Sequence, residues 1–291
     1  MDSQLRSPNL APTSGDGSVD SFRPFLLDGG IGCWARLRSG RVSESPLGDP
    51  AQVRALHRAY ALAGATRLRT ASFALPSALV RGMAEPEAAR ALLDSVASAT
   101  SVASGLLVSL GPTGLDHDAS DADRARPYAG LARALLPPRS EAIGPKLNAV
   151  VLETFRSWAE VSCAFDGLAA GGYEGDVWAI LSPFTSRELR DSDLAHAGER
   201  LARLGVSVAG IGCTTPEVAL DEALAALAEG FGGPLLLTPA VHRDGRVWAQ
   251  DTARIARGRA LDWVGGCCGA GPGHISALRA ELARTGEWIA E

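Results

Sequence analysis

Lysine and aromatic residues are scarce in this sequence. Lys146 is the only lysine among 291 residues, and Phe, Trp and Tyr together make up 5% of them. Arginine therefore carries nearly all of the positive charge, and acidic residues outnumber basic ones to give a net charge of −5. Because both signs are interspersed and no basic stripe is present, the sequence does not predict a nucleic-acid partner.

Long hydrophobic runs and targeting signals are also lacking. No run of about 18 apolar residues occurs, so neither a transmembrane helix nor a membrane partner is expected. Residues 1–22 are rich in Ser, Pro, Asp and Gly, and they have neither the charged start nor the apolar core of a signal peptide. We expect a disordered tail over residues 1–22, one folded domain over residues 23–291 and a cytoplasmic location.

Several common site motifs are missing. The sequence has no CxxC pair, no GxxxxGK[ST] and no GxGxxG after a strand, which argues against zinc fingers and phosphate-binding loops. The cysteines do not suggest a disulfide framework, because Cys267 and Cys268 are adjacent and neighbouring residues rarely bridge each other. Cys33 and Cys163 are interpreted as structural, and Cys163 falls within a helical pattern.

Short apolar runs alternate with amphipathic helical patterns along the chain. The predicted strands are Phe25–Asp28, Arg67–Ala71, Gly105–Leu110, Asn148–Glu153, Val177–Ser182, Ser207–Gly212, Pro234–Thr238 and Asp262–Gly266. The predicted helices are Pro50–Ala63, Glu85–Ala99, Ser157–Ala170, Asp193–Leu204, Pro216–Ala228, Asp251–Arg259 and Pro272–Ala283. Eight such units in about 270 residues favour a single (β/α)8 TIM barrel, with a doubly wound open sheet as the alternative. We interpret Pro112–Pro145 as a long loop over the barrel mouth, with one helical pattern at Tyr128–Leu136.

Polar and special residues recur where the predicted strands end. They are Asp28-Gly29-Gly30, Thr70, Ser72, Gly111-Pro112, Glu153-Thr154, Ser182, Cys213, Thr238 and Cys267-Cys268. Active sites of β/α barrels lie at the C-terminal ends of the strands. These residues are therefore expected to face one mouth of the barrel.

Three of these strand-end residues are cysteines, namely Cys213, Cys267 and Cys268, and each follows a glycine-containing run. Thiols that meet at one mouth form a soft donor set that suits zinc, and three protein ligands with an open fourth position are typical of a catalytic zinc site. The alternative is that each cysteine is a small buried hydrophobe. We predict one zinc ion per chain on these three residues, with its fourth position open to a substrate thiol.

Asp28 and Glu153 each end an apolar strand. Carboxylates at one mouth could bind an ammonium group through charge-assisted hydrogen bonds, and the N–H groups of Gly29 and Gly30 could bind a carboxylate. Helix capping, or burial as a satisfied acid, is the alternative for either acid. The predicted substrate-binding set is therefore Asp28, Gly29, Gly30 and Glu153.

Together these segments resemble the homocysteine S-methyltransferase family. The matching segments are Leu27-Asp28-Gly29-Gly30, Ser109-Leu110-Gly111-Pro112, Leu152-Glu153-Thr154-Phe155, Gly210-Ile211-Gly212-Cys213 with Pro216-Glu217, and Gly265-Gly266-Cys267-Cys268 with Pro272 and His274-Ile275. They follow the family's order over most of the chain. The resemblance implies that the three cysteines are zinc ligands, and that Glu153 and Asp28 hold the amino group of homocysteine.

The resemblance also implies an activity, the transfer of a methyl group to the thiol of homocysteine to give methionine. S-methylmethionine or S-adenosylmethionine is the expected donor, because no cobalamin or folate module is recognised in the sequence. Gly212 stands where the family usually has Asn, and this departure keeps open an acceptor that is another small thiol or a selenol. A zinc-binding relative without catalysis is a further alternative, and the oligomeric state is left open.

Overall fold

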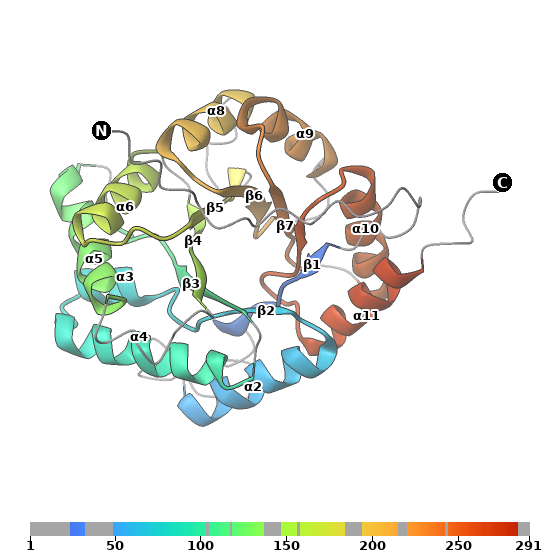
Figure 1. Ribbon diagram of the computed structural model, residues 1–291, viewed down its shortest axis with the longest axis horizontal. Coiled ribbons are helices and arrows are strands. Elements are labelled where there is room, and N and C mark those ends of the chain that lie inside the picture. The colour runs from blue at the N-terminus through green and yellow to red at the C-terminus, as the bar shows by residue number, and fades with distance from the viewer. Residues whose placement is uncertain are drawn as a thin grey trace, which may run out of the picture.

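The computed structural model describes residues 24–32, 49–102, 105–116, 118–136, 147–155, 158–183, 194–214, 220–241 and 244–284. Eight parallel strands form the centre of the molecule and helices surround them (Figure 1). The tail predicted over residues 1–22 lies outside the described residues. None of the helices in the described ranges has the length and hydrophobicity that a membrane span requires.

The strands pair in the order β1-β8-β7-β6-β5-β4-β3-β2. Their bounds are β1 Phe25–Leu26, β2 Arg67–Arg69, β3 Gly105–Leu110, β4 Leu147–Phe155, β5 Val177–Leu181, β6 Val208–Gly212, β7 Leu235–Thr238 and β8 Trp263–Val264. The two ends of this sheet meet through a parallel bridge between Leu27 and Arg67. The predicted (β/α)8 barrel is therefore confirmed, and the open sheet is not what the chain forms.

Nine helices lie in the described part of the chain and surround the strands (Figure 1). Their bounds are α2 Pro50–Ala63, α3 Leu75–Val80, α4 Glu85–Thr100, α5 Asp121–Ala134, α6 Trp158–Ala170, α8 Leu194–Leu204, α9 Leu220–Phe231, α10 Gly245–Gly258 and α11 Pro272–Ala283. Capping residues fix both ends of α2. Asp49 caps its start, and Gly64 ends it with a left-handed φ of 104°.

The prediction of a long loop over Pro112–Pro145 was wrong. Within Pro112–Pro145, described here as a loop with a helical pattern at Tyr128–Leu136, the chain forms the full helix α5 from Asp121. The Ser120 side chain accepts a hydrogen bond from the N–H of Asp123 and so caps the helix. The chain continues as helix through Pro127, a residue that usually interrupts one, and this explains why the pattern was read too short.

The core has two layers, one on each side of the strands. The inner layer fills the barrel with residues that point inward from successive strands. They are Leu27, Leu107, Ala149, Val151, Trp178, Ile180, Val208, Leu236 and Trp263. The outer layer packs the other strand face against the helices and includes Leu68, Leu106 and Val150. This alternation lets a polar side chain at a strand end point into the mouth.

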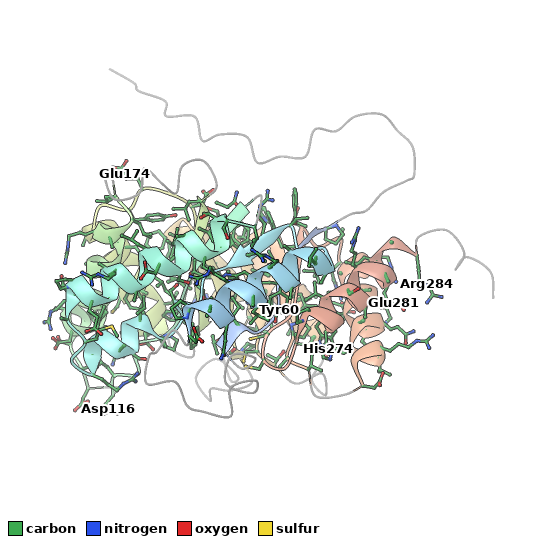
Figure 2. All side chains as sticks on the ribbon, turned by 90° about the horizontal axis from the view of Figure 1, so that it is seen from below. Tyr60, Asp116, Glu174, His274, Glu281 and Arg284 are labelled. Atoms are coloured by element: carbon green, nitrogen blue, oxygen red, sulfur yellow. The ribbon has the colours of Figure 1, made fainter. Side chains whose placement is uncertain are left out.

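The two ends of the barrel are distinguishable in Figure 2. Asp116, which follows β3, lies at one edge of the molecule, and His274, which follows β8, lies toward the same side. Glu174, which precedes β5, lies at the opposite edge. The segments that follow strands therefore mark one mouth, and the predicted functional residues belong to that end.

Candidate metal centre and the carboxylate pair beside it

Three thiols meet at the mouth of the barrel. Cys213 follows β6, and Cys267 and Cys268 follow β8 after two glycines. The three sulfur atoms all lie within 4.8 Å of one another, and the Sγ atoms of Cys213 and Cys268 are 3.5 Å apart. The structure thus brings together cysteines that are 55 residues apart in the sequence. Their role as metal ligands stays a prediction.

Backbone geometry aims these thiols at one another. Cys213 has a left-handed φ of 52°, which is uncommon for a residue with a side chain and is frequent at functional sites. Its N–H donates to the carbonyl of Thr238, and the N–H of Cys267 donates to that of Pro239. A turn closed by the Ala270 N–H and the Cys267 carbonyl follows the pair. The cysteines therefore sit on backbone that is held by neighbouring segments.

The donor set fits a zinc ion. In tetrahedral coordination two sulfur ligands at about 2.3 Å from zinc lie about 3.8 Å apart, which is close to the 3.5 Å between the Sγ atoms of Cys213 and Cys268. Hydrogen bonding with the Cys267 thiol lowers the pKa of Cys213, but contact with Cys268 and burial raise it, to about 11 overall. The crowded thiols thus favour protonation on their own, and a cation among them would supply the charge that stabilises thiolates.

Close packing of glycines brings the end of β1 against the cysteine segment. A Cβ atom on Gly30 would lie 2.5 Å from the carbonyl oxygen of Cys267, and one on Gly29 would lie 2.1 Å from that of Ala270. The N–H of Gly30 also donates to the Ala270 carbonyl, so a substrate carboxylate would compete for it. The proposed substrate contacts of Gly29 and Gly30 stay a prediction, but their packing role is clear.

Gly30→Ala is expected to displace the Cys267–Cys268 segment. The added methyl group would overlap backbone atoms, and overpacking of this kind typically costs about 1–3 kcal/mol. Thermal unfolding should show the loss of stability, and metal analysis should show a reduced zinc content. Gly273→Ala is the matched control, because a Cβ there would meet nothing within 4 Å. Equal behaviour of the two variants would contradict the packing role of Gly30.

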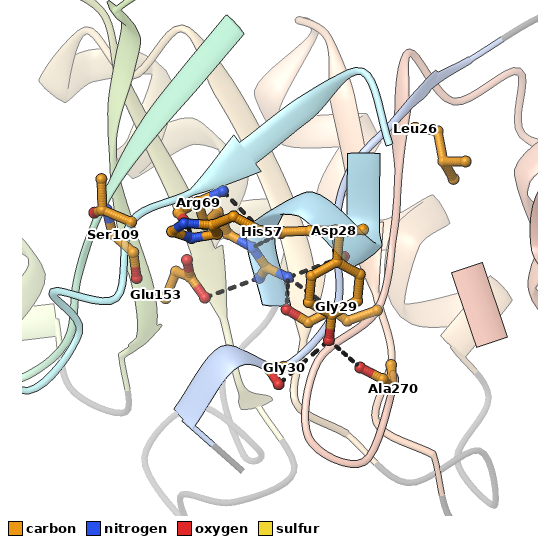
Figure 3. A network of polar contacts seen from close by, with 12 residues as sticks. Leu26, Asp28, Gly29, Gly30, His57, Arg69, Ser109, Glu153 and Ala270 are labelled. Atoms are coloured by element: carbon orange, nitrogen blue, oxygen red, sulfur yellow. Dashed lines mark hydrogen bonds and ion pairs between the residues drawn. The ribbon is translucent and has the colours of Figure 1, made fainter. Parts of the chain in front are cut away.

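The two predicted carboxylates are joined by an arginine (Figure 3). Arg69, the last residue of β2, donates from Nε to Oδ1 of Asp28 at 2.7 Å and from Nη1 to Oε2 of Glu153 at 3.0 Å. Its backbone N–H donates to the second oxygen of Asp28 at 2.9 Å. All three side chains are buried. The structure therefore brings Asp28 and Glu153 together, as the sequence predicts, but with a guanidinium group between them.

Burial and charge act against each other in this cluster. Burial raises the pKa of Asp28 and of Glu153, and Arg69 opposes that rise in both. Burial also disfavours the charged form of Arg69, but Glu153 and Asp28 outweigh it and raise the pKa of the guanidinium above its ordinary value. Arg69 is therefore charged and favours the ionised form of both acids, and a hydrogen bond with Ser109 favours the ionised form of Glu153 as well.

A distortion of β4 sets the direction of Glu153. The pairing of β4 with β5 shifts register between Glu153 and Phe155, and Thr154 at the bulge has a left-handed φ of 64°. Bulges of this kind re-aim side chains next to active sites. Oε1 of Glu153 is buried and has no hydrogen-bond partner among the described residues. An unpaired buried carboxylate oxygen is costly, so this atom is a candidate ligand contact.

Arg69 and the groups that hold it are not among the site residues that the sequence predicts. The Nε2–H of His57 donates to the carbonyl of Arg69, and Ser98 donates to Nδ1 of the same ring. Burial lowers the pKa of His57 to about 4, so the ring is neutral. Tyr60 donates to the carbonyl of Ala270 at 2.7 Å. The available signal for Arg69 was an arginine in the middle of the predicted strand Arg67–Ala71.

The remaining candidate side chains lie apart from this cluster. Cys163 is buried in α6, in agreement with a structural role. His274 accepts from the N–H of Gly271 at the start of α11. Cys33, His117 and His242 lie outside the described residues.

Comparison with known proteins gives one family and several structural relatives. A family model described as homocysteine S-methyltransferase matches residues 25–282. The metallated form of the homocysteine methyltransferase MmuM from Escherichia coli is 22% identical with a TM-score of 0.71, covering 88% of this chain and 96% of that one. Its apo form is 23% identical with a TM-score of 0.70, covering 89% and 95%.

A more distant structural match shows the barrel alone. The carboxyl transferase domain of Rhizobium etli pyruvate carboxylase is 14% identical with a TM-score of 0.51, covering 91% of this chain and 48% of that one. No curated protein matches in a sequence comparison. The structural likenesses establish the fold, and the family model covers nearly all of the barrel.

Proposed function

The chain belongs to the homocysteine S-methyltransferase family, and from this we propose that it transfers a methyl group to the thiol of homocysteine to give methionine. One observation carries the proposal: the three sulfur atoms lie within 4.8 Å of one another, at the same mouth as an acid with an unpaired oxygen. Homocysteine carries its thiol and its ammonium group at opposite ends of a short chain. A soft metal centre beside a carboxylate matches those two ends.

Cys213, Cys267 and Cys268 would hold the zinc ion, one per chain. Zinc bound there would lower the pKa of an added thiol, so that the acceptor is present as a nucleophilic thiolate at neutral pH. The chain's own contribution is to place the acceptor. The thiol end would be fixed at the cysteines, and the ammonium end would be attracted by the net negative charge of the cluster of Asp28, Arg69 and Glu153.

We propose S-methylmethionine or S-adenosylmethionine as the donor. Each is a sulfonium compound whose methyl group is electrophilic and whose sulfur carries a positive charge. Two carboxylates with one arginine beside three cysteines place net negative charge at this mouth when both acids are ionised, and that charge favours the approach of such a cation. Incubating the purified protein with homocysteine and each donor separately, and measuring methionine by mass spectrometry, tests both donors. Bound zinc with no methionine from either donor would instead support a non-catalytic relative.

A different small thiol or a selenol is the second candidate acceptor. Gly212 precedes Cys213, and a Cβ there would lie 2.4 Å from Oγ1 of Thr238 and 2.6 Å from Ile180. The position therefore has no room for a side chain. The surface next to the thiols consequently differs from that of family members that have Asn here. Methylation of selenohomocysteine or cysteamine in preference to homocysteine would favour this candidate.

Glu153→Gln is expected to weaken homocysteine binding while leaving zinc in place. The substitution keeps the shape of the side chain but removes its charge. A charged hydrogen bond to an ammonium group contributes roughly 1.5–3 kcal/mol, so the loss in affinity should be about 10- to 150-fold. Calorimetric titration with homocysteine, together with metal analysis, measures both effects. An unchanged affinity would remove Glu153 from the ammonium site.

A further inference from the structure

Arg69 uses nearly all of its donors inside the protein. Besides its bonds to the two acids, Nη2 donates to the carbonyl oxygens of Asp28, Gly29 and Gly266, at 3.1, 3.0 and 2.6 Å (Figure 3). These carbonyls come from the ends of β1 and β8. The guanidinium group thus fixes the backbone next to the cysteine segment and cannot leave without breaking several bonds.

Asp28 and Glu153 differ in whether a carboxylate oxygen is left without a hydrogen-bond partner. Asp28 exposes none of its surface, and Arg69 holds both of its carboxylate oxygens. Glu153 gives Oε2 to Arg69 and keeps Oε1 without a partner among the described residues. The acids are therefore not an equivalent pair. One of them faces only Arg69, and the other presents a free oxygen.

With both acids ionised, the charges of the cluster sum to a single negative charge. Two carboxylates and one guanidinium give −1, which matches one ammonium group. Without Arg69 the buried acids would repel each other, and one would tend to take up a proton. The position of Arg69 is also fixed from both sides, since its N–H bonds Asp28 and its carbonyl accepts from His57. The arrangement is preorganised before any ligand arrives.

We propose that Arg69 is a positioning residue that sets the specificity of the acceptor pocket: it takes up the charge of Asp28, so that Oε1 of Glu153 alone binds the ammonium group of the acceptor. This inference rests on the proposed function, because it concerns the same pocket. Glu153 is then the acid that contacts the ammonium group. Asp28 acts only through Arg69.

The preference for an ammonium group can be measured directly. 4-Mercaptobutanoate has the thiol and carboxylate of homocysteine but lacks the amino group. Calorimetry on the zinc-loaded protein gives the dissociation constants of homocysteine and 4-mercaptobutanoate. Their ratio isolates the contribution of the amino group. Thermal unfolding of each variant checks that it is folded, and the zinc content checks that the metal centre is retained.

The decisive variants first change the net charge of the cluster by one unit and then restore it with a second substitution. Asp28→Asn leaves a neutral pair of Arg69 and Glu153, so the ammonium preference should fall by about 10-fold or more. Adding Arg69→Gln removes the opposing positive charge, so the ammonium group of the acceptor becomes the cationic partner that favours the ionised form of Glu153, and the preference should recover to within a few-fold of the wild type. Glu153→Gln should also lose the preference, but Arg69→Gln should not rescue it, because Asp28 does not face the ligand.

This asymmetric rescue is the result expected. If Arg69→Gln fails to restore the Asp28→Asn variant, or if it restores Glu153→Gln equally well, the assignment is overturned. Arg69→Met serves in the double variants if glutamine does not fold there, and the same outcomes apply. A wild-type protein that binds neither thiol would instead remove the proposed function itself.

Discussion

Changing Cys267 or Cys268 to alanine is expected to abolish both zinc binding and methyl transfer. Each substitution removes one of three sulfur atoms that lie within 4.8 Å of one another, and two thiols with an open side do not make a catalytic zinc site. Loss of a supporting hydrogen bond to a metal ligand alone costs about 10- to 100-fold, so loss of a ligand should cost more than about 100-fold in activity. Metal analysis and methionine formation measure the two effects.

Cys163→Ala is the control for these variants. Its thiol is buried in α6, outside the three-sulfur cluster, so the change should leave the zinc content unaltered. Any loss of stability from the smaller side chain would show in thermal unfolding and not in metal content. If Cys267→Ala and Cys268→Ala both retain a full zinc ion, the metal centre is not where the sequence and the geometry place it.

The cysteine cluster could be predicted from the sequence because the barrel topology brings the ends of all parallel strands to one mouth. Parallel strands end at one mouth, so residues at the ends of β6 and β8 meet even though 55 positions separate Cys213 from Cys268. The same logic brings Asp28 and Glu153 to one place. Strand-end position is thus enough to say which residues meet, provided that the strands are recognised.

What could not be predicted is how those residues are paired. Arg69 ends a three-residue strand with the pattern Arg-Leu-Arg, which by itself resembles a strand with an exposed polar face. Only the register shows its direction, because Arg69 is paired with Leu107 of the inner layer and so points into the barrel. The strain at Thr154 and Cys213 is likewise a property of the folded backbone that no residue pattern announces.

The boundary errors have the same origin. The structure ends β1 at Leu26 and β8 at Val264, earlier than the apolar runs suggest, and single backbone hydrogen bonds join the two segments beyond these ends. The Gly266 N–H donates to the Asp28 carbonyl, for example. Tertiary contacts of this kind also give Gly29 and Gly30 a packing role, and their predicted contacts with substrate stay a prediction.

The binding of homocysteine is expected to release close to one proton at pH 7. A free thiol has a pKa of about 8.5, so only about 3% of it is thiolate at this pH, whereas the proposed acceptor is bound as the thiolate. Calorimetry in buffers of different ionisation enthalpy measures the number of protons released. The same titration with homoserine isolates the sulfur, because homoserine shares the amino and carboxylate groups and replaces the thiol by a hydroxyl.

Homoserine should bind more weakly than homocysteine by about 100-fold or more, which corresponds to roughly 2.7 kcal/mol. Its hydroxyl keeps its proton at neutral pH and is a poorer partner for the soft centre that three cysteines form. Its ammonium group can still reach Glu153, so the residual affinity should fall further in Glu153→Gln. Equal affinity for the two ligands, with no dependence on the buffer, would mean that the sulfur of the acceptor does not meet the metal centre, and the proposed methyl transfer could not proceed at these cysteines.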